Sequence, residues 1–121
     1  MMAVKAVSLN GTVAAGSTGN FLSPPILERH RPVSILVWSS VSATGSKFSA
    51  FLTKSPTPVS EPQVGDPQAF MLLNVQVYGT NVFSTPLAMT TYVDPPVRLA
   101  FSFTNAATSE ATVVVTYLYE V

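Results

Sequence analysis

The end of the chain, ATVVVTYLYEV (111–121), places apolar side chains on alternate positions. One face receives four large apolar residues, Val113, Val115, Tyr117 and Tyr119. The other face receives Val114 and Leu118 among polar residues. A strand that shows one face to water has polar residues throughout that face. The pattern therefore predicts a strand covered on both faces. The second face is covered either by a neighbouring subunit or by the fold's own loops or N-terminal arm.

The same period of two recurs along most of the chain. It predicts strands at 3–9, 32–43, 47–55, 69–78, 82–93, 97–104 and 111–121. Ten prolines and six glycines interrupt the sequence, and helix signals are nearly absent. We therefore predict an all-β fold, either an antiparallel β-sandwich or a jelly-roll or Greek-key barrel of about seven or eight strands.

The sequence shows no internal repeat and a single domain. Residues 1–20 contain a Gly-, Ser- and Asn-rich stretch, which predicts a flexible N-terminal arm or an edge strand. Residues 21–121 then form one β-sandwich domain. Four prolines fall within 56–67, and this density predicts a long surface loop because proline lacks the N–H that a sheet needs.

The composition points to association rather than to a free surface. Charged residues make up 10% of the chain, compared with about 25% in typical soluble domains. Hydrophobic residues reach 47%, yet no apolar run is long enough for a membrane helix. Six basic residues balance six acidic ones, which argues against nucleic acid or an anionic membrane as a partner. We infer that neighbouring subunits cover much of the surface.

The sharpest local charge feature is the segment LERHRP (27–32). It holds Glu28, Arg29, His30 and Arg31 in direct succession. Arginine pairs bind phosphate well, but one short cluster in a neutral chain is a weak signal for nucleic acid. A solvated loop is the simplest alternative. We predict that this segment and the second face of the last strand, Val114 and Leu118, contact another subunit.

The residues needed for catalysis are scarce. The chain has no cysteine and one histidine, and its six acidic residues show no metal-ligand spacing. His30 would have to serve as the base for any serine nucleophile, with Asp66 or Asp94 behind it, and no G-x-S-x-G elbow is present. We expect a protein that is not an enzyme and holds neither a metal nor another cofactor.

Aromatic residues offer a different function, a platform for sugar rings. The candidates are Trp38, Tyr78, Tyr92, Tyr117 and Tyr119. Trp38 lies in the middle of the most hydrophobic strand, and Tyr117 and Tyr119 share a face with valines, so a place in the core is the stronger prediction for these three. Tyr78 and Tyr92 lie near strand ends and are the better candidates for exposure.

Two segments resemble a known class of proteins. These are the hairpin and proline-rich loop RPVSILVWSSVSATGSKFSAFLTKSP (31–56) and the ending PPVRLAFSFTNAATSEATVVVTYLYEV (95–121). Their order resembles small β-sandwich structural proteins of tailed phages and related viruses, including head-decoration and minor capsid subunits. The resemblance implies a virion subunit that binds copies of itself and a major capsid or other shell protein. It transfers no functional residue.

The alternatives are a subunit of an extracellular filament and a carbohydrate-binding β-sandwich module. Residues 1–16 carry one lysine and lack the continuous apolar core of a secretory signal. We therefore expect assembly in a host cytoplasm and a place in the virion. An extracellular location is the alternative.

Overall fold

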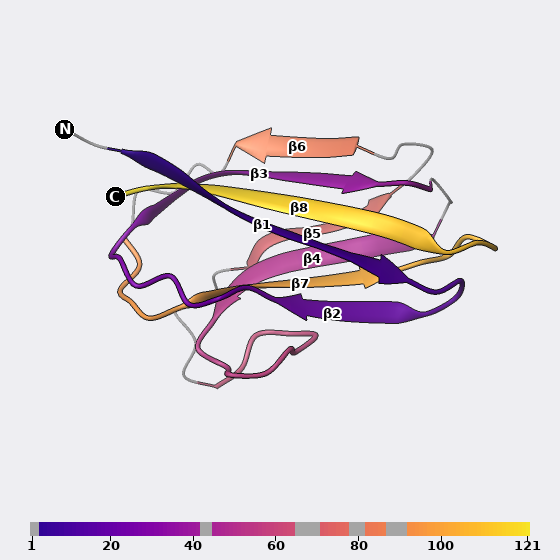
Figure 1. The fold of residues 1–121 in the computed structure, drawn as a ribbon, viewed down its shortest axis with the longest axis horizontal. Coiled ribbons are helices and arrows are strands. Elements are labelled where there is room, and N and C mark those ends of the chain that lie inside the picture. Colours follow the sequence, from indigo (N-terminus) through magenta and orange to yellow (C-terminus); the bar gives the residue numbers. More distant parts are fainter. Residues whose placement is uncertain (1–2, 42–44, 65–70, 78–81, 87–91) are drawn as a thin grey trace.

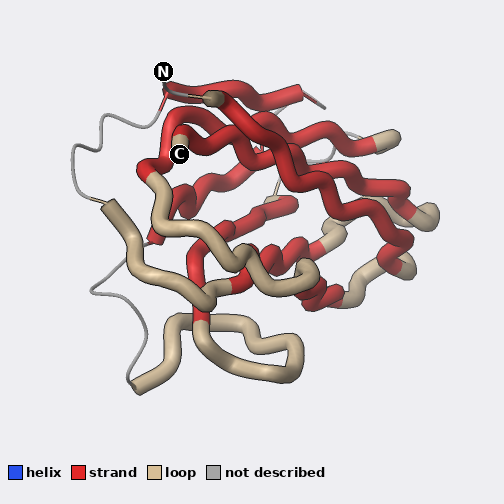
Figure 2. Tube along the Cα trace, turned by 60° about the vertical axis from the view of Figure 1, so that its left-hand side comes forward, coloured by secondary structure: helices blue, strands red, loops and turns tan. Residues whose placement is uncertain are grey.

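The computed structural model describes residues 3–41, 45–64, 71–77, 82–86 and 92–121, with 71–77 and 82–86 described by their backbone alone. These ranges contain two four-stranded antiparallel sheets and no helix (Figures 1 and 2). The strands are β1 (Val4–Val13), β2 (Thr18–Leu22), β3 (Arg31–Ser39), β4 (Ser46–Thr53), β5 (Met71–Val77), β6 (Val82–Pro86), β7 (Arg98–Thr104) and β8 (Ala111–Glu120). The prediction of an all-β antiparallel sandwich is confirmed.

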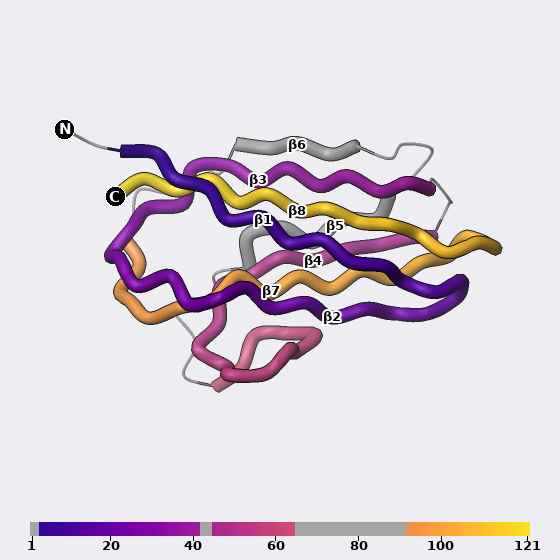
Figure 3. Tube along the Cα trace, in the orientation of Figure 1, coloured from indigo at the N-terminus to yellow at the C-terminus, as the bar shows by residue number. Residues whose placement is uncertain are grey.

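The chain pairs its first half with its second half. β1 pairs with β8, β2 with β7, β3 with β6 and β4 with β5, all antiparallel. Two further pairings, β8 with β3 and β7 with β4, close the sheets in the orders β1-β8-β3-β6 and β2-β7-β4-β5. Figure 3 shows the result, in which β1 and β8, from opposite ends of the chain, run side by side.

The core lies between the two sheets. The inner face of β8 contributes Val113, Val115, Tyr117 and Tyr119, all buried as their spacing predicts. Leu99, Phe101 and Phe103 of β7 face them from the other sheet. Full burial of a large apolar side chain contributes about 1.5–3 kcal/mol. These two alternating rows therefore explain much of the stability of the fold.

Trp38 is not in the core, and that prediction is wrong. In β3 the inward positions are Ile35 and Val37, while Leu36 and Trp38 face outward with 43% and 38% of their surfaces exposed. The pairing of β3 with β8 fixes this parity, because Val37 lies opposite the buried Val115 and Trp38 lies opposite Val114. Adjacent residues of a strand point to opposite faces, so the register sends Trp38 outward.

Residues 4–22 form the edges of both sheets. β1 pairs with β8 over its whole length, and β2 pairs with β7. The boundary predicted between residues 20 and 21 falls inside β2. At the corner where the two edges meet, a Cβ on Gly11 would overlap the ring of Phe21. Glycine at position 11 therefore allows the β2 side chain to lie against the β1 backbone.

The proline-rich loop 54–64 lies along part of the outer face of β4 and β7. Residues 56–64 belong to the predicted surface loop, and 65–67 lie outside the described residues. Phe51 and Ala100 are paired across the two strands, on the side away from the core cluster, yet both are 0% exposed. Pro56 lies beside the next outward cross-strand pair on one side of Phe51 and Ala100. Ser60 lies beside the next outward pair on their other side. The loop therefore runs along this face beside Phe51 and Ala100. Figure 3 shows its course beside β7 and β2.

Candidate subunit interface

The outer face of β1, β8 and β3 presents apolar side chains to solvent. Cross-strand register arranges this face in three rows, Asn10–Val114–Trp38, Ser8–Thr116–Leu36 and Ala6–Leu118–Ser34. We call the four large apolar residues, Leu36, Trp38, Val114 and Leu118, the outer apolar face. Leu36 and Trp38 are exposed, whereas Val114 and Leu118 are half-buried between them and the β1 edge.

The neighbours of the outer apolar face are short and uncharged. Alanine, serine, threonine and asparagine fill the remaining positions of the three rows. Val4, which is 60% exposed, extends the apolar surface along β1. Contiguous apolar surface of this kind marks contact sites with other proteins. The outer face of this sheet is thus open towards solvent at Leu36 and Trp38 of β3, and the predicted subunit contact at Val114 and Leu118 stays a prediction.

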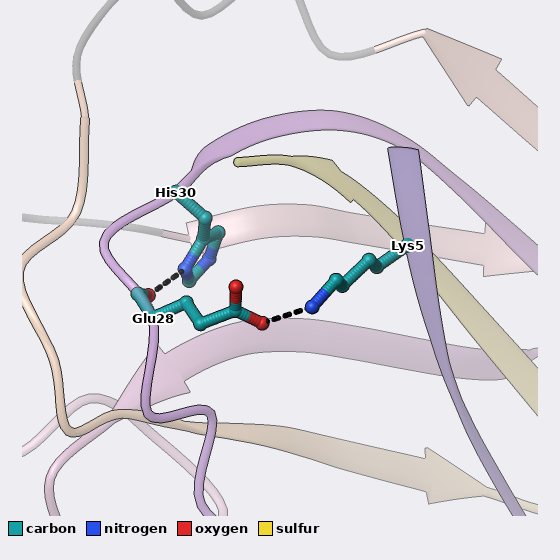
Figure 4. A network of polar contacts seen from close by, with 3 residues as sticks. All are labelled: Lys5, Glu28 and His30. Carbon is teal, nitrogen blue, oxygen red and sulfur yellow. Dashed lines mark hydrogen bonds and ion pairs between the residues drawn. The ribbon is translucent and has the colours of Figure 1, made fainter. Parts of the chain in front are cut away.

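Charged residues gather at one end of this sheet, where they pair within the chain. Lys5 Nζ of β1 donates to the carboxylate of Glu28 (Figure 4). Arg31 Nη2 lies 3.1 Å from Glu120 Oε1. The first pair ties the segment before β3 to β1, and the second ties the start of β3 to the end of β8. Glu28 and Arg31 therefore have internal partners, and their predicted contact with another subunit stays a prediction.

Arg29 lies on the exposed side of the same segment. Its Nε is 3.2 Å from Asp94 Oδ1, and its guanidinium stands 4.6 Å from the centre of the Tyr92 ring. Both Arg29 and Asp94 are mostly solvent-exposed, so the ion pair contributes less than about 1 kcal/mol. Of the four predicted residues in this segment, Arg29 is the most accessible to a partner.

His30 is buried, which removes it from the predicted contact surface. Its side chain is 0% exposed, and its backbone forms a bridge with Val93. Nδ1 lies 3.1 Å from the Glu28 carbonyl oxygen, as Figure 4 shows, and Nε2 lies 2.9 Å from the Tyr117 hydroxyl. A carbonyl can only accept, so Nδ1 carries the proton and Nε2 accepts from Tyr117.

Burial sets the protonation state of this pair. Desolvation lowers the pKa of His30, because the charged imidazolium would lose its water, and it raises the pKa of Tyr117. The hydrogen bond to Glu28 raises the pKa of Lys5. At neutral pH the structure thus has a neutral histidine beneath a charged lysine–glutamate pair. A buried, internally bonded histidine of this kind stabilises the corner of the fold.

The aromatic residues do not form one platform. Tyr117 and Tyr119 are buried as predicted, Trp38 lies on the outer apolar face, and Tyr92 lies beneath Arg29. Tyr78 lies outside the described residues. Within the described ranges, no three His, Cys, Asp or Glu side chains converge as metal ligands. The same ranges contain no helix with the length and apolar character needed to cross a bilayer.

Comparison with known proteins gives little similarity. No protein-family model matches the sequence, and no curated protein matches it. Among solved structures, the fold is similar to a chain in the structure of the infectious bursal disease virus Gx strain, with a TM-score of 0.37 and 10% sequence identity. The similarity covers 99% of this chain and 36% of the viral chain.

Proposed function

We propose that this protein is a non-enzymatic structural subunit of a virion, a capsid decoration or minor capsid protein that binds copies of itself and a protein shell. The proposal rests on the outer apolar face. A chain with 10% charged residues leaves Leu36 and Trp38 exposed on a sheet surface whose neighbouring positions are uncharged. Such a surface favours association over solubility as a monomer.

The strand order supports the capsid class. Each strand of the first half pairs with its counterpart in the second half, and the sheets have the orders β1-β8-β3-β6 and β2-β7-β4-β5. We infer that the sandwich is a jelly roll, an arrangement of two Greek keys found in viral capsid and lectin domains. Because a fold does not determine a function, this order agrees with the proposal without establishing it.

An interface formed by the four side chains of the outer apolar face alone would be too small for a durable oligomer. Removing an exposed large apolar side chain from water contributes at most about 1.5–3 kcal/mol, whereas association costs roughly 4–15 kcal/mol in lost freedom of motion. Val4 and Ala6 extend the apolar surface along β1, and both are exposed. A second subunit that covers β3, β8 and β1 together would bury enough surface for a durable oligomer. The shell protein would then occupy another face.

The proposal that the protein is not an enzyme is supported by His30. It is the one histidine of the sequence, and both of its ring nitrogens have partners inside the fold. A general base must reach the proton that it removes, and this imidazole is 0% exposed. We place the protein in the virion, assembled in the host cytoplasm, with an extracellular filament subunit as the alternative.

Light scattering tests the proposal directly. The mass of the purified protein is measured over a roughly hundredfold dilution, because mass action separates tight from weak association. A closed oligomer that persists on dilution supports the proposal, and Leu36→Lys should reduce it to a monomer. Thr108→Lys, in the exposed loop before β8, is the matched control. Open-ended growth would support the filament instead, and a monomeric wild type would contradict self-association.

A further inference from the structure

A groove lies on the other sheet, on the outer face of β2, β7 and β4. Its volume is about 460 Å³. Strand residues, among them Thr18, Ser49 and Thr104, form its floor, and the loop residues Ser60, Glu61 and Pro62 form one wall. It lies beside the covered pair Phe51–Ala100 and on the opposite side of the sandwich from the outer apolar face. The groove is therefore separate from the face on which we propose that copies of the chain associate.

The floor of the groove is a regular array of short polar side chains. Register places Thr18, Thr104 and Lys47 in one row, and Asn20, Ser102 and Ser49 in the next. Adjacent strands lie about 4.8 Å apart, and successive residues on one face lie about 6.7 Å apart. The array thus spans about 10 by 7 Å, which accommodates one or two sugar rings.

The polar groups of the groove retain capacity for a ligand. The Thr18 and Thr104 hydroxyls lie 2.9 Å apart, and Ser102 donates to Asn20 over 2.8 Å. A hydroxyl has one donor and two acceptor sites, so each pair can make further bonds. Within the described part of the chain, the side chains of Ser49 and Ser60 make no hydrogen bond.

Charge and shape narrow the class of ligand. Lys47 and Glu61 are the charged residues of the lining, and their charges cancel. An anion such as a phosphate would meet the Glu61 carboxylate, whereas a neutral polyol can donate to it and accept from Lys47. Pro62 adds an apolar ring to the wall. We propose that this groove binds a neutral oligosaccharide, whose hydroxyls both donate and accept as the floor requires.

The first test is a binding screen with the full chain. The probes are neutral hexasaccharides of glucose, mannose and N-acetylglucosamine, with sialyllactose and a heparin hexasaccharide as acidic comparisons. We expect at least one neutral glycan to bind and the acidic ones to bind more weakly. Failure of all neutral probes, or a preference for the acidic ones, would overturn the proposal.

The second test places the site by calorimetric titration of the neutral glycan that binds. The double variant Thr104→Val, Ser60→Ala removes one hydroxyl from the floor and one from the wall. Two lost hydrogen bonds should weaken binding at least about tenfold. Thr112→Val removes an exposed hydroxyl from the opposite sheet and should leave the affinity unchanged. Unchanged affinity in the double variant, or loss of binding in Trp38→Ala, would place the sugar elsewhere and overturn the proposal.

Discussion

On the outer face of β4, Phe51 is completely buried, whereas on the outer face of β3, Leu36 and Trp38 keep 43% and 38% of their surfaces exposed. These residues occupy equivalent places, since each points away from the core of the sandwich. The proline-rich loop 54–64 borders the outward positions on either side of Phe51, while the described residues place no segment over Trp38. The chain therefore covers one outer face itself around Phe51, while its described residues leave the other face open around Trp38.

An apolar residue on the outer face of a sheet is either covered by another segment of the same chain or left at an open surface. Ala100 and Phe51 belong to a local second core beneath the loop. Val114 and Leu118 have the same alternating pattern in sequence but are half-buried at an open surface. Substitutions at the two faces should thus divide into effects on folding and effects on assembly.

The largest effect on stability is expected at the covered face. Phe51→Ala should lower the free energy of unfolding by about 3–5 kcal/mol, because it leaves a cavity beneath the loop. Leu36→Ala, on the open face, should lower it by less than about 1 kcal/mol. Urea unfolding, followed by circular dichroism, measures both. A small effect of Phe51→Ala would mean that the loop does not seal this face.

An effect of intermediate size on stability is expected for the buried hydrogen bond between Tyr117 and His30, in the interior of the sandwich. Tyr117→Phe removes the donor to His30 Nε2 and leaves a buried acceptor without its partner. The cost of such a group is about 1–3 kcal/mol. Tyr119→Phe is the matched control on the same strand and face, and urea unfolding at neutral pH measures both variants. Equal, small effects would contradict the hydrogen bond at Tyr117.

The buried pair of His30 and Tyr117 also predicts that the stability of the fold depends on pH. Burial lowers the pKa of His30 below its unfolded value of about 6.5, so the unfolded chain binds more protons as pH falls. Stability from His30 should be complete above pH of about 6.5 and decline as pH falls towards the folded pKa. The nearby ionisable groups are Tyr117, Tyr119, Glu28 and Lys5.

Thermal unfolding between pH 7.5 and 5 measures this effect, since histidine is the side chain whose charge ordinarily changes in this range. His30→Phe lacks the titrating group and should show a flatter pH profile than the wild type, whatever its stability at pH 7.5. Parallel profiles would show that another group is responsible.

The β-sandwich was predictable because its alternation is local. The period of two assigned Val113, Val115, Tyr117 and Tyr119 to the core correctly. It could not choose the buried face of β3, since Leu36 and Trp38 are as apolar as Ile35 and Val37. Pairing with β8, a strand from the far end of the chain, makes that choice.

His30 was misplaced for a different reason. The register of β3 shifts between Pro32 and Ser34, so the inward residues are even-numbered before the shift and odd-numbered after it. A bulge of this kind adds a residue to one strand and leaves no clear mark in the sequence. The flanking charges of Arg29 and Arg31 also favoured an exposed loop. The cover over Phe51 was equally hidden, because a loop's path depends on distant contacts.

The smallest effect on folding, and the most direct test of the open face, is expected at β8. Val114→Lys and Leu118→Lys place a charge on the outer apolar face, where a long lysine stem can cover neighbouring carbon while its ammonium reaches water. The free energy of unfolding should change by less than about 1 kcal/mol, while the oligomer measured by light scattering should be lost. Thr108→Lys adds the same charge in the exposed loop before β8 and should leave the oligomer intact. General unfolding of both β8 variants would instead show that Val114 and Leu118 belong to an internal core, and the difference between the two outer faces would no longer hold.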